Sequence, residues 1–114
     1  MIDIPDKVMF YKDPVDFRNQ LDGLIKKILW FGDDPSNGCL YIFRNKREDR
    51  FKMVLFDTNG YWLLFRRLSN GKFKMPKDNG KKIILSKRRL IWLLSGAETE
   101  QKTSYNPCKY RILE

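Results

Sequence analysis

The segment from Gly38 to Pro76 restricts the fold of this chain more than any other part of the sequence. Short runs of apolar and aromatic residues alternate there with turn segments rich in Gly, Asn and Ser. Asn59-Gly60 is the strongest hairpin signal, because both residue types tolerate positive φ. Connections this short force neighbouring strands to run antiparallel. We therefore predict a meander whose strands lie at 40–44, 50–56, 61–68 and 72–75.

A helix is predicted between the N-terminus and this meander. Asp13 is suited to the N-cap, Pro14 to the first helical position and Asp16 to the first turn. Gly32 supplies the stop. Apolar residues recur between these limits at helical spacing and form one stripe that must lie on a sheet. The stripe comprises Phe17, Leu21, Leu24, Ile25, Ile28 and Leu29.

Two further strands and a second helix complete the predicted fold. Residues 8–11 and 83–85 are short apolar runs, and Ser86 is placed to cap a helix that ends at Gly96. The expected fold class is α+β, with an antiparallel β-meander of about five strands and two packed α-helices. We expect residues 1–96 to form this single domain and 97–114 to form a polar tail, in which Tyr110 to Leu113 offers an additional edge strand.

Composition narrows the class of protein. Hydrophobic residues make up 42% of the 114 residues and aromatic residues 14%, which favours a folded core over disorder. No apolar run approaches the ~20 residues that cross a bilayer, and the N-terminus lacks the layout of a secretory signal. Cys39 and Cys108 are too few and too far apart for a disulfide framework. These features predict a cytoplasmic protein without a membrane association.

The positive charge is concentrated in one part of the chain. The net charge is +9, yet residues 1–37 hold 5 basic and 7 acidic side chains, whereas residues 44–89 hold 15 basic and 4 acidic. Such a field favours polyanions, because neutralising phosphates releases condensed counterions. Nucleic acid is the expected partner; the alternative is a generally basic, soluble surface.

Pairing across the hairpin at Asn59-Gly60 assigns residues to the two faces of the sheet, provided that the loop holds an even number of residues. The predicted core face carries Phe51, Met53, Leu55, Trp62, Leu64 and Leu68. On the other face Arg50, Lys52 and Arg67 converge beside Phe65. Like charges opposed across strands destabilise a sheet unless a counter-charge lies between them. That counter-charge is either a bound phosphate or a carboxylate of Glu48, Asp49 or the first helix.

The start of the last helix is a second candidate anion site. Lys87, Arg88 and Arg89 lie in its first turn, where the helix dipole disfavours cations and free backbone N–H groups favour phosphate. The alternative is that these side chains simply extend into solvent. Aromatic residues among the cations, chiefly Tyr61, Trp62 and Phe65, either stack on unpaired bases or belong to the core. The predicted nucleic-acid-binding residues are Arg44, Lys46, Arg47, Arg50, Lys52, Arg66, Arg67, Lys87, Arg88 and Arg89.

Catalysis is the less favoured class of function. The chain has no histidine, which removes His-based general bases, nucleophile activation and metal ligation. Asp16 and Asp22 are the carboxylates that a small metal-dependent nuclease would use. Alternatively, Asp16 caps the helix and Asp22 pairs with Arg18 or Lys26. We predict a protein that is not an enzyme and that uses no metal or cofactor.

An ordered set of residues resembles one family of bacterial mobile elements. The chain is similar to the TnpB-type accessory protein encoded by the second open reading frame of the insertion-sequence family numbered sixty-six. The match includes the meander motifs Phe43-Arg44-Asn45, Asp49-Arg50 and Arg66-Arg67-Leu68, together with the family-signature residues Asp16, Arg18, Asp22, Asp57 and Gly60.

The resemblance implies a part in transposition beside a separate, larger transposase. Combined with the charge, it predicts a non-catalytic accessory factor that binds DNA by its phosphates, at element ends, or bridges DNA to the transposase. The alternative is a protein–protein adaptor that docks on the transposase without direct DNA contact.

Overall fold

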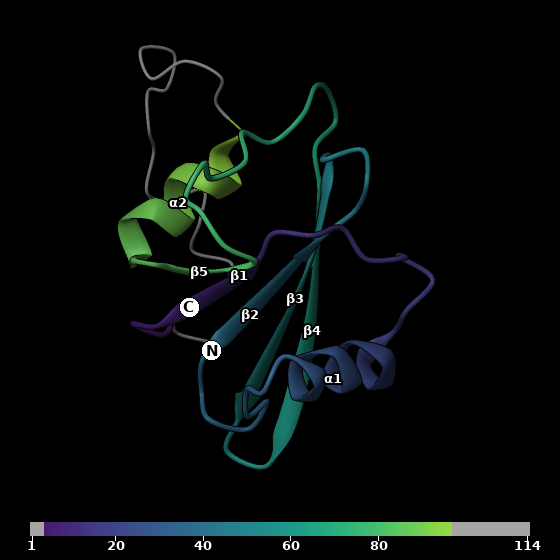
Figure 1. Ribbon diagram of the computed structural model, residues 1–114, viewed down its shortest axis with the longest axis vertical. Coiled ribbons are helices and arrows are strands. Elements are labelled where there is room, and N and C mark those ends of the chain that lie inside the picture. The colour runs from purple at the N-terminus through teal and green to yellow at the C-terminus, as the bar shows by residue number, and fades with distance from the viewer. Residues whose placement is uncertain (1–3, 97–114) are drawn as a thin grey trace.

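Five strands in the order β4-β3-β2-β1-β5 form one mixed sheet in the computed structural model, which describes residues 4–96 (Figure 1). The α+β class, with five strands and two helices, is confirmed. All strand pairs are antiparallel except β1–β2, which is parallel, so the meander proper comprises β2, β3 and β4. The elements are β1 (Val8–Tyr11), α1 (Leu21–Trp30), β2 (Leu40–Arg44), β3 (Arg50–Asp57), β4 (Gly60–Arg67), β5 (Lys82–Leu85) and α2 (Lys87–Ser95).

The hairpin of β3 and β4 has the predicted face assignment but a different turn. Asp57 pairs with Gly60, so the two-residue turn is Thr58-Asn59 and Gly60 already belongs to β4. Thr58 takes the positive φ, at 58°. Because the loop length is even, Arg50, Lys52, Phe65 and Arg67 share one face, as the sequence predicted. The shifted turn sets the register, with Arg50 directly opposite Arg67 and Lys52 opposite Phe65.

Each face of the sheet carries its own buried core, which corrects the prediction of a single core face. Successive strand residues point to opposite sides. Thus Phe51 and Met53 pack with Leu90 of α2, whereas Val54 packs with Leu24 of α1. The two helices therefore cover opposite faces, and Figure 1 shows them on either side of the sheet.

Helix α1 begins at Leu21, and the prediction of a start at Asp13-Pro14 was wrong. Residues 13–20 form a loop whose backbone is held by tertiary hydrogen bonds. The N–H of Val15 donates to the carbonyl of Arg44 at 3.0 Å. The ammonium of Lys52 donates to two further carbonyls, those of Phe17 and Asn19. These long-range bonds outweigh the local capping signal, which is a weak determinant.

Residues 72–75 do not form the predicted strand. A single backbone bond, from the N–H of Phe73 to the carbonyl of Glu48 at 2.7 Å, joins this segment to the turn between β2 and β3. The Phe73 ring is buried and stacks on Phe51 with centroids 3.9 Å apart. The chain is thus fixed by one aromatic side chain and then leaves the sheet toward β5.

The second helix begins and ends as the sequence predicted. The Ser86 hydroxyl accepts the N–H of Arg89 at 3.2 Å, and Gly96 ends α2 with a φ of 69°. Cys39 is buried beside the start of β2. The predicted tail, its edge strand and Cys108 lie outside the described residues. Neither helix found in residues 4–96 has the length and apolar character needed to cross a bilayer.

Candidate nucleic-acid interface

Two basic segments that are distant in sequence are joined at one end of the sheet. The turn between β2 and β3 and the segment that follows β4 lie side by side, because Leu68 N–H donates to the Asp49 carbonyl at 3.0 Å and Phe73 N–H to that of Glu48. Asn45 shapes the turn: its side-chain oxygen accepts the N–H groups of Asp49 and Arg50 at 3.1 and 3.0 Å. We call this surface the basic end. It comprises Lys46, Arg47, Arg50, Arg67, Lys72 and Lys74.

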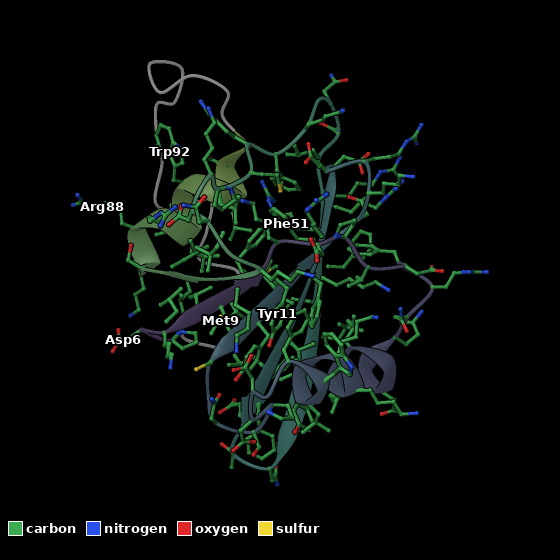
Figure 2. All side chains as sticks on the ribbon, in the orientation of Figure 1. Asp6, Met9, Tyr11, Phe51, Arg88 and Trp92 are labelled. Carbon is green, nitrogen blue, oxygen red and sulfur yellow. The ribbon has the colours of Figure 1, made fainter. Side chains whose placement is uncertain are left out.

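The cations of the basic end are exposed and mostly unpaired. All but Arg50 are exposed, and within residues 4–96 only Arg50 makes an ion pair, with Asp49 at 3.7 Å. The nearby carboxylates are engaged: Glu48 pairs with Arg44, and the Asn45 side chain donates to Asp49 and holds the pKa of that carboxyl below its usual value. The segments 44–50 and 66–77 together carry nine basic and two acidic side chains. Figure 2 shows many nitrogen-tipped side chains around this part of the molecule.

Three of the predicted nucleic-acid-binding residues serve the fold. The guanidinium of Arg44 donates to the carbonyl of Lys12 at 2.7 Å. Lys52 is 5% exposed, and its ammonium donates to the carbonyls of Phe17 and Asn19 at 2.9 and 2.7 Å. Arg66 donates to the carbonyl of Leu94 at 2.8 Å, at the C-terminal end of α2 where a cation is favoured. We therefore leave these three out of the interface.

At the start of α2, carboxylates from elsewhere in the chain pair with two of the three cations. Lys87 lies 3.4 Å from Asp6, and Arg89 makes two hydrogen bonds to Asp78, at 3.0 and 2.7 Å. The bonds from Arg89 hold the pKa of Asp78 below its usual value. All three cations are exposed, but Arg88 makes no ion pair with the residues that the structure describes. Figure 2 shows its side chain directed away from the helix. With Ser86 used as the cap, this site offers less to an anion than the sequence suggested.

Two cations of the basic end were missed by sequence reasoning. Lys72 and Lys74 flank the buried Phe73 and are both exposed. The available signal was the predicted strand over 72–75, in which one apolar residue between two lysines indicates that both lysines face solvent. In the structure this segment is not a strand, yet Phe73 is buried and both lysines are exposed. Of the aromatic residues considered for stacking, Phe65 is 56% exposed and its ring meets Phe17 edge-on at 6.3 Å.

Comparison with known proteins identifies the family. The family model described as IS66 Orf2 like protein matches residues 6–104. The chain belongs to the IS66 Orf2-like family. This family is associated with insertion sequences and is an accessory family, not one of known catalysts.

Relatives of this IS66 Orf2-like protein occur in Sinorhizobium fredii. One, y4jC, named only as an uncharacterized protein, is 30% identical over 96 residues, which cover 81% of this chain and 80% of the relative. A second, y4hO, also named as uncharacterized, is 34% identical over 65 residues, or 57% of this chain and 56% of the relative. No solved structure gives a significant match.

The signature residues of this IS66 Orf2-like protein lie in loops and at element ends. Asp16 and Arg18 form an exposed pair with a shortest distance of 2.5 Å, and this pairing lowers the pKa of Asp16 to about 2. Asp22 lies in the first turn of α1, where its charge suits the helix dipole. Asp57 and Gly60 close the hairpin. In the part of the chain that the structure describes, no three carboxylate or cysteine side chains are grouped to hold a metal ion.

Proposed function

We propose that this IS66 Orf2-like protein is a non-catalytic accessory factor of transposition that binds DNA through its basic end and assists a separate transposase. The observation that carries the proposal is the group of exposed cations on two adjoining segments. Lys46, Arg47 and Arg67 lie there with Lys72 and Lys74, and the local carboxylates are already engaged. We propose the ends of the mobile element as the DNA that it contacts.

The chemistry of the basic end suits phosphates more than bases. Lys and Arg side chains that have no protein counter-charge release condensed counterions when they meet phosphates, and this release drives association. Phosphate contacts position a protein without reading sequence. Arg50 and Arg67, directly opposed across the hairpin, are relieved of mutual repulsion by a phosphate between them. On this proposal, selection of element ends comes from the transposase.

Fluorescence anisotropy of the purified protein with labelled duplex and single-stranded DNA, over a salt series, tests the proposal. We expect log K to fall linearly with log salt, with a slope of about −0.9 per contacted phosphate on duplex. Lys46→Gln and Arg67→Gln should each reduce the slope by about 0.9. Lys26→Gln, on the exposed side of α1, is a matched control that should leave it unchanged.

The rival function is an adaptor whose basic end meets an acidic surface of the transposase. It predicts no binding to DNA in the absence of a partner, even at low salt. That result would overturn direct DNA binding, and the purified transposase would be the next ligand to titrate. Binding to DNA alone, with the slope lowered by the two substitutions, would exclude the rival.

A further inference from the structure

Helix α1 covers only part of its face of the sheet. A five-stranded sheet is about 24 Å wide and a helix about 10 Å across, so one helix leaves strands open. Ile84 of β5 pairs with Met9 of β1, which belongs to the α1-side core, so Ile84 lies on this face. It is 61% exposed. Ile84 is therefore an apolar side chain that α1 leaves uncovered, whereas Met9 and Tyr11 of β1 on the same face are buried.

A separate groove runs between α1 and the loop that precedes it. Its cavity volume is about 600 Å³, within the range of ligand and peptide pockets. Residues spaced i, i+3, i+4 and i+7 on the helix form one wall, and the loop 13–15 forms the other. Tyr11 and Phe31 form the floor, where burial and the adjacent Asp33 carboxylate raise the pKa of the Tyr11 hydroxyl. The helix wall consists of Gly23, Lys26, Lys27 and Trp30.

Trp30 stands at the rim of the groove as its most exposed apolar side chain, with 79% of its surface accessible. It contacts a neighbouring ring on one side. Its ring meets Phe31 edge-on at 5.2 Å, and Phe31 stacks on Tyr11 at 4.6 Å. Leu29, beside it, is also exposed. An exposed tryptophan beside an exposed leucine is typical of a protein-binding surface.

The charges available at the groove are positive. Asp13 pairs with Lys81 at 3.5 Å, and Asp33 accepts from Lys82 at 3.2 Å and from the Tyr11 hydroxyl at 2.6 Å. Lys26 and Lys27, by contrast, make no ion pair with any residue from 4 to 96. A partner that complements this rim carries carboxylates beside an apolar side chain.

We infer that the groove beside α1 binds a protein segment in which an apolar side chain is flanked by aspartate or glutamate. The apolar side chain enters between Trp30 and the 13–15 loop, and the carboxylates meet Lys26 and Lys27. A nucleic-acid strand is the poorer occupant, because Asp13 and Asp33 line or adjoin the groove and Trp30 is its one protruding ring. The basic end and this groove then hold different partners at once.

Two-dimensional NMR of the full chain, observing the tryptophan indole N–H signals, tests this inference. The probes are two peptides of about a dozen residues with the same Phe and Leu positions, one with Glu between them and one with Lys. We expect the Glu peptide to shift the Trp30 signal while Trp92, on α2, stays unchanged. Trp30→Ala should weaken peptide affinity about tenfold, and the matched exposed variant Trp92→Ala should not.

Paired neutralisations separate this inference from the proposed DNA binding. Lys26→Gln/Lys27→Gln should weaken the Glu peptide by about threefold to tenfold, as expected for two exposed ion pairs, and leave DNA affinity unchanged. Lys72→Gln/Lys74→Gln should weaken DNA binding and leave the affinity for the Glu peptide unchanged. Either function can fail in this design without affecting the readout of the other.

Several outcomes would overturn the inference. They are absence of Glu-peptide binding, equal binding of the Lys peptide, or a larger Trp30 shift with oligo-dT than with peptide. Two others indicate a different occupant. Nuclear Overhauser contacts from Trp30 to residues 97–114 would assign the groove to the chain itself, and a Trp30 shift on dilution would assign it to a second copy.

Discussion

The basic end and the start of α2 look alike in the sequence and differ in the structure. Each brings together at least three Lys or Arg residues close to an element boundary. At the start of α2, Asp6 and Asp78 come from elsewhere in the chain and pair with two of the cations. At the basic end, the carboxylates of its own turn, Glu48 and Asp49, are both engaged within that turn. The distribution of carboxylates, more than the density of cations, therefore decides where positive charge remains available to a ligand.

The strongest test of this comparison neutralises three cations at each place. Lys46→Gln/Arg47→Gln/Arg67→Gln should lower DNA affinity about 500-fold at ~0.1 M salt, because each lost phosphate contact removes nearly one unit of log K. Lys87→Gln/Arg88→Gln/Arg89→Gln removes the same formal charge and should lower affinity less than about threefold. Anisotropy titrations of both variants at one salt concentration make the measurement. Equal losses in the two variants would mean that net charge alone controls binding.

A second test separates two adjacent arginines of β4. Arg66→Ala removes a part-buried, charge-assisted hydrogen bond to the Leu94 carbonyl and should lower the free energy of unfolding by about 1–3 kcal/mol. Arg67→Ala, at an exposed position, should change it by less than about 0.5 kcal/mol. Urea denaturation followed by circular dichroism gives both values. If the two variants were equally stable, Arg66 would belong with the surface cations.

The smallest expected effect is a pKa change at Asp16, whose carboxylate pairs with the Arg18 guanidinium within one exposed loop. The guanidinium hydrogen bonds lower the pKa of Asp16 to about 2, so the carboxylate form is favoured in the folded protein. The pair is fully present above about pH 4 and is lost as the pH falls through about 2. NMR titration of the Asp16 carboxyl should show this pKa, and Arg18→Ala should return it to about 3.9. An unchanged value in Arg18→Ala would remove Arg18 as the cause.

Local signals in the sequence predicted most of the fold. The bounds of β1 and β2 and the Ser86 cap follow from short apolar runs and from a serine before a helical stripe. The helix start at Asp13 failed because bonds from Lys52 and to Arg44 hold residues 13–20 in a loop. Those partners lie in β2 and β3, and the local capping signal carries no information about them. The parallel pairing of β1 with β2 was likewise not predicted, because it depends on the arrangement of the whole sheet.

The candidate site was only partly predictable for the same reason. Charge density located the region, and the even loop length placed Arg50 and Arg67 on one face of the hairpin. The sequence did not separate surface cations from Arg44, Lys52 and Arg66, because the groups that bind these three are backbone carbonyls of distant residues. The groove beside α1 was not anticipated either, since it depends on how much of the sheet one short helix covers.

The position of β1 has a consequence for the order of assembly. This strand precedes the others in the chain, yet within residues 4–96 it is the only sheet neighbour of β5, with Val8 opposite Leu85. The hairpins of β2, β3 and β4 are local and form rapidly once exposed. Docking of β5 and α2, in contrast, joins the two ends of the described chain, a long-range closure that slows folding. The N-terminal strand therefore remains open on that edge until nearly the whole domain has emerged from the ribosome.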